Sequence, residues 1–179
     1  NDNPIEAVYH TACGGNTEDS ENVWGNKVSY LRRVECIYCK DSPYWKTVKN
    51  FSIRELKRRL GINFDENSVD KKEIPGLIDK VVSTVAGRIK KIRIGDMVFD
   101  GDEVRNLLHL PSTKFSWRVS GISFEAMGMG HGLGLCQYGA RGMALLGFPV
   151  DEILKFYFTG VELKTLEKPT SAKPLTGKV

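Results

Sequence analysis

Short apolar segments of two different periodicities are separated by long polar stretches along this chain. Alternating apolar and polar positions predict strands over residues 5–10, 28–34, 97–99, 115–119 and 122–127. Residues 80–85 and 88–94 predict a β-hairpin about Ala86-Gly87. In its second strand Ile92 and Ile94 follow the same inward and outward alternation, whereas Ile89 falls on the opposite face.

Helical spacing and end signals predict four short helices. Ser52 and Glu55 have the spacing of a capping box, and Gly61 ends the helix that follows. The other three helices are predicted over residues 102–108 with Asp102 as the cap, 137–146 and 150–158.

The order of these elements predicts the fold class. Strands and helices are segregated rather than alternating, which favours an α+β fold with mainly antiparallel strands, several short helices and long loops. We expect a single domain over residues 1–163, with a polar loop over 65–75 and a polar C-terminal tail over 164–179.

Composition narrows the choice of partner only weakly. The 179 residues are 41% hydrophobic and 27% charged, which is ordinary for a globular protein with one core. A net charge of +4 is too small to indicate nucleic-acid binding, so we expect none, although it is compatible with an anionic cell-wall polymer. No apolar run approaches the roughly 20 residues of a membrane helix, so we expect the chain itself to be soluble.

The four cysteines form the first candidate site. Cys36 and Cys39 make a C-x2-C pair, while Cys13 and Cys136 lie in distant glycine-rich loops. Four thiolates in loops suit a tetrahedral structural zinc ion, in which His10 or His131 could replace one ligand. Two disulfides, a redox-active C-x2-C pair and four unpaired buried thiols stay open as alternatives.

Two loops carry most of the remaining polar chemistry. Residues 128–144 combine six glycines with His131, Cys136 and Gln137, and such glycine density permits close backbone approach. The structural alternative is a tight turn in which His131 hydrogen-bonds to the backbone and has no functional role. Residues 9–24 group a histidine, carboxylates, hydroxyls and Trp24, which suits either a carbohydrate site or a solvated acidic loop.

These two loops resemble the stage II sporulation protein D family and its relative, the amidase enhancer. The resemblance rests on two motifs, Gly128-Met-Gly-His131-Gly-Leu-Gly-Leu-Cys136-Gln-Tyr138-Gly-Ala-Arg-Gly-Met-Ala144 and His10-Thr-Ala-Cys13-Gly-Gly-Asn-Thr17. It is supported by Trp24, Tyr30-Leu-Arg-Arg-Val34, Ser42-Pro43 and Ile153-Leu-Lys-Phe-Tyr157-Phe-Thr-Gly160. In this family positions 13 and 136 are Ser or Cys, so two cysteines there fit a shared sulfur site.

The resemblance implies a peptidoglycan lytic transglycosylase. Such an enzyme cleaves the β-1,4 bond between N-acetylmuramic acid and N-acetylglucosamine in strands stripped of stem peptides, and leaves a 1,6-anhydro product. A carboxylic acid with a raised pKa must protonate the glycosidic oxygen. The resemblance further implies an exported, membrane-anchored parent protein at the extracytoplasmic face or cell wall. This protein would work beside a cell-wall amidase or endopeptidase during engulfment in sporulation.

The family's catalytic glutamate lies in a Ser-Glu-Met-Pro-like motif followed by an Ala-Arg-Thr-Tyr helix. Neither motif occurs in these 179 residues. We therefore expect the catalytic acid upstream of Asn1, with Glu21 as the fallback.

By the same resemblance, six residues would line a glycan groove: His10, Ser20, Glu21, His131, Gln137 and Tyr138. A second hypothesis is a non-catalytic peptidoglycan-binding or amidase-activating module. A third is a zinc-stapled structural domain. The first two require the two loops to form a single face.

Overall fold

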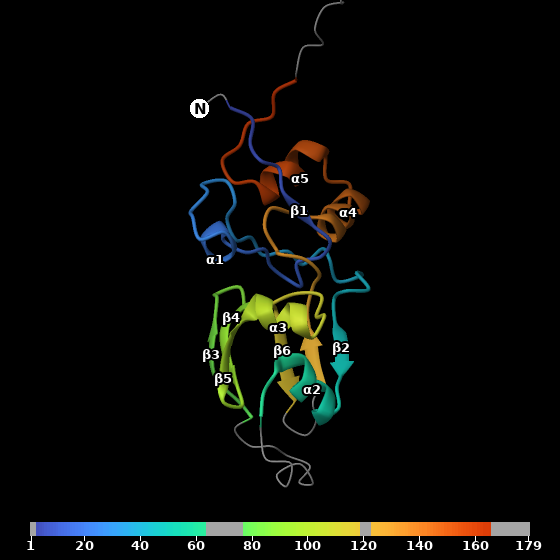
Figure 1. Ribbon diagram of the computed structural model, residues 1–179. Coiled ribbons are helices and arrows are strands. Elements are labelled where there is room, and N and C mark those ends of the chain that lie inside the picture. Colours follow the sequence, from blue (N-terminus) through green and yellow to red (C-terminus); the bar gives the residue numbers. More distant parts are fainter. Residues whose placement is uncertain (1–2, 64–76, 119–122, 166–179) are drawn as a thin grey trace, which may run out of the picture.

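The computed structural model describes residues 3–63, 77–118 and 123–165, which together hold five helices and eight strands (Figure 1). The expected α+β class with mainly antiparallel strands is confirmed. The predicted polar loop over 65–75 lies outside the described residues, as do the strand ends Val119 and Ile122 and the tail from residue 166. The predicted domain boundary at residue 163 stays a prediction.

Two antiparallel three-stranded sheets and two helices form the lower part of the molecule in Figure 1. One sheet has the order β3 (Ile78–Ser83), β4 (Ile89–Ile94), β5 (Met97–Asp100), and the other β2 (Thr47–Asn50), β7 (Ser123–Ala126), β6 (Phe115–Arg118). The helices are α2 (Ile53–Leu60) and α3 (Gly101–Leu107). The elements enclose one apolar core, which includes Leu56, Ile92, Val104, Leu108, Phe115 and Phe124.

A β-bulge explains the odd phase of Ile89 in the sequence. The residue pairs between β3 and β4 show that β4 carries one extra residue, Lys90, just after Ile89. An extra residue shifts the inward and outward alternation by one position. Ile89, Ile92 and Ile94 therefore all reach the core.

The upper part of the molecule is built from loops and three helices around a second core (Figure 1). Its helices are α1 (Ser20–Val23), α4 (Gln137–Leu145) and α5 (Val150–Tyr157). β1 (Tyr9–His10) pairs in parallel with β8 (Leu135–Cys136). The second core contains all four cysteines together with Leu31, Met143, Ile153, Tyr157 and Phe158. Cysteine packing is therefore central to this part of the fold.

Helix ends mostly follow the predicted signals. Ser52 accepts the Glu55 N–H at 3.2 Å, and Gly61 ends α2 with φ 64°. The predicted cap of α3, Asp102, is wrong because β5 runs directly into the helix and makes Asp100 the N-cap. The carboxylate of Glu103, three residues later, accepts the Asp100 N–H at 2.8 Å.

Two strand predictions need correction, and two strands of the structure were not predicted. Only Tyr9–His10 of residues 5–10 is a strand, because Val8 turns back to the carbonyl of Glu6. Residues 28–34 form no strand, since side chains take their backbone donors: Thr17 accepts the Val34 N–H and Asp19 accepts the Arg33 N–H. The unpredicted strands are β2 at 47–50 and β8 at 135–136. No helix in the described ranges is long and apolar enough to cross a membrane.

Candidate functional site

The two motif loops lie against each other, as the sequence predicts. Tyr9 pairs with Leu135, His10 pairs with Cys136, and Ala12 forms a further bridge with Met129. Two glycines allow this contact, because a Cβ at Gly14 would lie 2.8 Å from the backbone of residue 128 and one at Gly128 only 2.6 Å from the carbonyl of Ala12. The dense glycines thus bring the two backbones together.

The four cysteines meet where these loops join. Cys13 follows β1, Cys36 and Cys39 lie in the loop before β2, and Cys136 is the N-cap of α4. All four thiols are buried and free, and their Sγ atoms lie within 4.8 Å of one another. The Sγ atoms of Cys13 and Cys39 are 3.4 Å apart, far beyond the roughly 2.05 Å of a disulfide. The disulfide alternative is therefore not what the structure shows.

The cluster fits the geometry of a tetrahedral metal ion. Zinc–sulfur bonds of about 2.3 Å in a tetrahedron place sulfur atoms roughly 3.8 Å apart, which lies between the 3.4 Å of the Cys13–Cys39 pair and the 4.8 Å that bounds all four Sγ atoms. Further donors surround the sulfurs, since the N–H groups of Cys13 and Gly139 each lie 3.3 Å from the Cys136 Sγ. The Tyr157 hydroxyl lies 3.2 Å from the Cys36 Sγ. Such outer contacts orient metal-binding thiolates and moderate their charge.

Without a cation the pKa values of the four thiols are shifted in opposite directions. Hydrogen bonding to Cys136 and Cys36, together with burial, raises the pKa of the Cys13 thiol. Hydrogen bonding from Cys13 lowers the pKa of Cys39. A buried group of thiols in this state is a ready acceptor for a divalent cation, because a cation removes the repulsion among thiolates.

The two loop histidines serve first as links within the structure. The rings of His10 and His131 lie 5.7 Å apart. His131 accepts the Leu133 N–H on Nδ1 at 3.0 Å and contacts the Tyr9 carbonyl through Nε2 at 3.1 Å, which assigns the neutral Nε2–H tautomer. Burial lowers the pKa of His131. Both of its nitrogens therefore already have partners.

His10 differs from His131 in having one free nitrogen. Its Nδ1 contacts the carbonyl of Leu133 at 3.0 Å, whereas Nε2 is buried with no hydrogen-bond partner among the described residues. Burial lowers the pKa of His10 to about 3, and the nearby Arg88 charge adds to this effect. His10 is thus a neutral imidazole with an unused acceptor.

Helix α1 holds the next two predicted residues, Ser20 and Glu21. Ser20 is fully buried, and its Oγ accepts the Val28 N–H at 2.7 Å. Glu21 pairs with Arg32 through two contacts of 2.6 and 2.8 Å. The Arg32 guanidinium lowers the pKa of Glu21 to about 2. Such a carboxylate is held ionised, which is the opposite of what a general acid requires.

The last two predicted residues open helix α4. Gln137 is exposed, and Tyr138 is half-buried against the upper core with its N–H on the carbonyl of Thr11 at 3.1 Å. Of the six predicted groove residues, the fold thus brings His10 and His131 together. Ser20 and Glu21 lie on α1, and Gln137 and Tyr138 lie at the start of α4.

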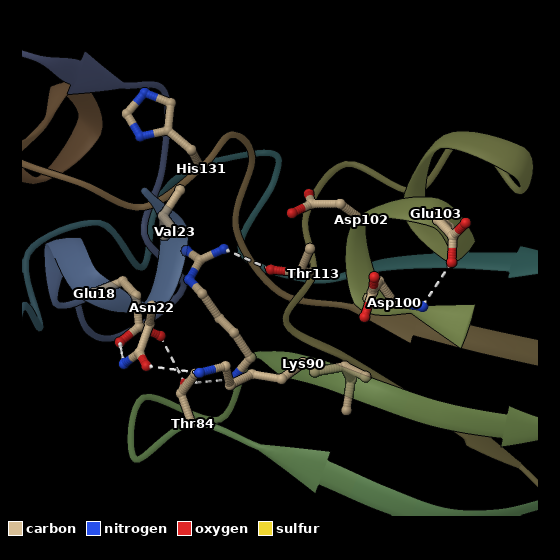
Figure 2. A pocket seen from close by; sticks show the side chains of 13 residues that line it. Glu18, Asn22, Val23, Thr84, Lys90, Asp100, Asp102, Glu103, Thr113 and His131 are labelled. Carbon is tan, nitrogen blue, oxygen red and sulfur yellow. Dashed lines mark hydrogen bonds between the residues drawn. The ribbon is translucent and has the colours of Figure 1, made fainter. Parts of the chain in front are cut away.

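A pocket of about 350 Å³ lies where the upper and lower parts meet, and His131 is the only predicted groove residue in its lining (Figure 2). Figure 2 shows Glu18 and Asn22 on the α1 side and Asp102 and Glu103 on the α3 side, with Thr84 and Lys90 from the hairpin region. The remaining lining residues are Val23, Arg88, Ile89, Asp100, Gly101 and Thr113. Most residues of the lining therefore have polar or charged side chains, with Val23 and Ile89 as its apolar members.

Sequence reasoning missed most of this lining. Arg88 follows a turn glycine at the start of a predicted strand, and no spacing marks it as functional. It is only 2% exposed, and its Nη1 donates to Thr113 Oγ1 at 3.4 Å and to the Gly130 carbonyl at 3.3 Å. Those partners come from separate parts of the chain, so only the folded structure identifies the residue.

Comparison with known proteins gives three informative similarities. The chain is 32% identical over 166 residues to the stage II sporulation protein D of Bacillus subtilis, covering 91% of this chain and 46% of that protein. It is 34% identical over 165 residues to an uncharacterized protein of Brachyspira hyodysenteriae, covering 89% and 43%. It is 24% identical over 208 residues to the amidase enhancer of B. subtilis, covering 89% and 30%.

The expected resemblance to sporulation protein D and the amidase enhancer is thus confirmed by homologues with those names. No protein-family model matches the chain. The chain spans less than half the length of these curated relatives.

Proposed function

We propose that this chain is the glycan-binding part of a peptidoglycan-remodelling protein related to sporulation protein D, with its loops held by a structural zinc ion. The observation that carries the proposal is the polar pocket beside the paired motif loops. The relatives' names support a role at the cell wall, in sporulation and beside an amidase.

The chemistry of the pocket suits a carbohydrate. Carboxylates, an amide and hydroxyls line it, and these groups bond to the hydroxyls and acetamido groups of amino sugars. Trp24 follows the lining residue Val23 in the chain, and its side chain is 40% exposed. An exposed indole next in the chain to a lining residue could offer a stacking surface for a sugar ring.

The zinc ion in this proposal is structural. Four cysteine ligands would complete its coordination and leave no position for water, which is the arrangement of structural rather than catalytic zinc. Cys13, Cys36, Cys39 and Cys136 would hold the ion, and its chemistry would be limited to linking the three segments that carry them. The motif loops would then keep their relative positions when a polymer binds.

The finer proposal is that the parent protein is a lytic transglycosylase. It would cleave the bond between N-acetylmuramic acid and N-acetylglucosamine with a 1,6-anhydro product. The Ser-Glu-Met-Pro-like motif that carries the family's acid does not occur in this sequence, and the fallback Glu21 is held ionised by Arg32. We therefore assign the proton-donating acid to a part of the protein other than the described residues. The parent would be exported and membrane-anchored, with a cell-wall amidase or endopeptidase as partner.

The alternative is a non-catalytic, amidase-activating module. It is favoured by the similarity to the amidase enhancer and by the ionised state of Glu21. In that case the pocket would bind glycan and present it to an amidase, without a chemical step of its own.

A binding and cleavage assay on denuded glycan strands distinguishes between these proposals. The purified chain is mixed with strands, and bound protein is measured after sedimentation; products are analysed by mass spectrometry, with and without an added cell-wall amidase. We expect binding without 1,6-anhydro products from this chain. Faster amidase turnover on intact peptidoglycan would favour the activating module, and an absence of binding would contradict the proposed function. Anhydro products from this chain alone would show that it holds the acid.

A further inference from the structure

One charged residue of the pocket has unused hydrogen-bonding capacity. Arg88 is 2% exposed and lines the pocket, yet its Nε and Nη2 are buried without a hydrogen-bond partner among the described residues. Leaving such donors unpaired is costly in a folded protein, and they are rare in native structures. A site that keeps them is a candidate for a ligand that supplies the missing acceptors.

The carboxylates around Arg88 do not supply them. Glu18 accepts from Asn22 Nδ2 at 2.9 Å and from Thr84 Oγ1 at 2.6 Å. Asp100 pairs with Lys91 at 3.0 Å, and Asp102 pairs with Arg105 at 3.6 Å. No carboxylate of the described residues forms an ion pair with Arg88.

The surroundings fix the guanidinium in place. Its other nitrogen, Nη1, is held by Thr113 and by the Gly130 carbonyl. Gly132 packs against the group so closely that a Cβ there would lie 2.3 Å from Nη2. Arg88 is therefore positioned before any ligand arrives, so little side-chain entropy is lost on binding.

We propose that Arg88 forms a carboxylate-binding subsite in this pocket. The unused Nε and Nη2 carry the parallel N–H bonds that bind the two oxygens of a planar carboxylate. A singly charged carboxylate also suits a pocket whose other walls carry Glu18 and Asp102 better than a doubly charged phosphate does.

The identity of the carboxylate rests on the proposed function. In peptidoglycan the sugar acid is muramic acid, whose lactyl carboxylate is free only when no stem peptide is attached to it. The resemblance already implies a preference for strands without stem peptides, and we assign the recognition behind that preference to Arg88.

The test compares two ligands on the unaltered chain. Binding of the disaccharide N-acetylglucosaminyl-N-acetylmuramic acid is measured by calorimetry or ligand-observed NMR, beside its lactyl methyl ester. Loss of a charge-assisted pair predicts about tenfold to a hundredfold weaker binding of the ester. Equal binding of acid and ester would overturn the subsite while leaving the proposed function intact. Binding of neither ligand nor of denuded strands would overturn both.

Variants then assign the preference to Arg88. Arg88→Lys keeps the positive charge but removes the two-pronged donor, and it should reduce the preference for the acid to less than about threefold. Arg54→Lys is the matched control, because it makes the same substitution at an exposed arginine on α2 that is not among the residues lining the pocket, and it should keep the full preference. Unchanged preference in Arg88→Lys, with an unfolding temperature like that of the wild type, would refute the assignment. The acid and ester comparison on the wild type decides the subsite even if that variant unfolds.

Discussion

Removal of the proposed metal should destabilise the whole upper part of the molecule. The four cysteines join segments that are far apart in sequence, since Cys13 and Cys136 are 123 residues apart and Cys13 and Cys39 are 26 apart. A permanent link that closes loops of these lengths removes about 5 and about 3.5 kcal/mol of unfolded-chain entropy, respectively. The chain segments closed by these two links overlap at Cys13, so their entropy terms cannot be added. We therefore use the larger value alone as the expected loss of stability.

A loss of about 5 kcal/mol corresponds to a fall of roughly 10–20 °C in the unfolding temperature of a domain of this size. The assay is thermal unfolding followed by circular dichroism, under reducing conditions, with and without a strong zinc chelator. Elemental analysis should first give one zinc ion per chain, and thiol titration should give four protected cysteines that become reactive after chelation.

A ligand variant provides the internal control for this experiment. Cys36→Ser should lower the unfolding temperature to that of the chelated wild type, and the chelator should then have no further effect, because both changes remove the same link. A metal-free wild-type protein that unfolds at the same temperature with and without chelator would refute the reasoning. The same holds if its four thiols react freely in the folded state.

Two further predictions follow from the glycine loop and the buried imidazole. Gly132→Ala and Gly147→Ala both place alanine at φ 87°, but only the first puts a Cβ against Arg88, at 2.3 Å from Nη2. Urea unfolding should therefore show Gly132→Ala to be at least about 2 kcal/mol more costly than Gly147→Ala, and equal costs would contradict the packing of Arg88 on the loop. Burial lowers the pKa of His10 from 6.5 to about 3, so only the unfolded chain binds this proton between those values. Stability should fall by up to about 1.4 kcal/mol per pH unit as pH drops from 6.5 towards 3, and His10→Gln should flatten the pH curve of the unfolding free energy relative to wild type. Parallel curves for the two proteins would contradict the buried neutral state.

The parts of the fold that sequence predicts well are those decided by neighbours in the chain. The helix from Ser52 to Gly61 and the hairpin about Gly87 follow from local caps, turns and periodicity. The strand expected over 28–34 fails because Thr17 and Asp19 take its donors from a loop more than ten residues away. A short pattern cannot report such long-range competition.

The candidate site divides in the same way. The glycine motif and the cysteines can be recognised from the residue content of their loops, and the structure brings them together as expected. The pocket cannot be recognised in the sequence, because its lining residues come from α1, the β3–β4 hairpin, α3 and the glycine loop. Arg88 reaches the carbonyl of Gly130, which is 42 residues away, and nothing in the local sequence encodes that contact.

The unsatisfied groups of the described residues lie close to one another, and this clustering supports a binding role for the region. The buried side-chain nitrogens without a partner there belong to two residues, His10 and Arg88. Gly130 packs beneath His10 and Gly132 beneath Arg88, since a Cβ at either glycine would lie under 3 Å from the side chain concerned. A purely structural loop could satisfy these nitrogens or replace them with apolar groups at little cost. A loop that instead keeps both unsatisfied, and uses glycines to fit them, follows the pattern of a site whose missing acceptors and donors come from a ligand.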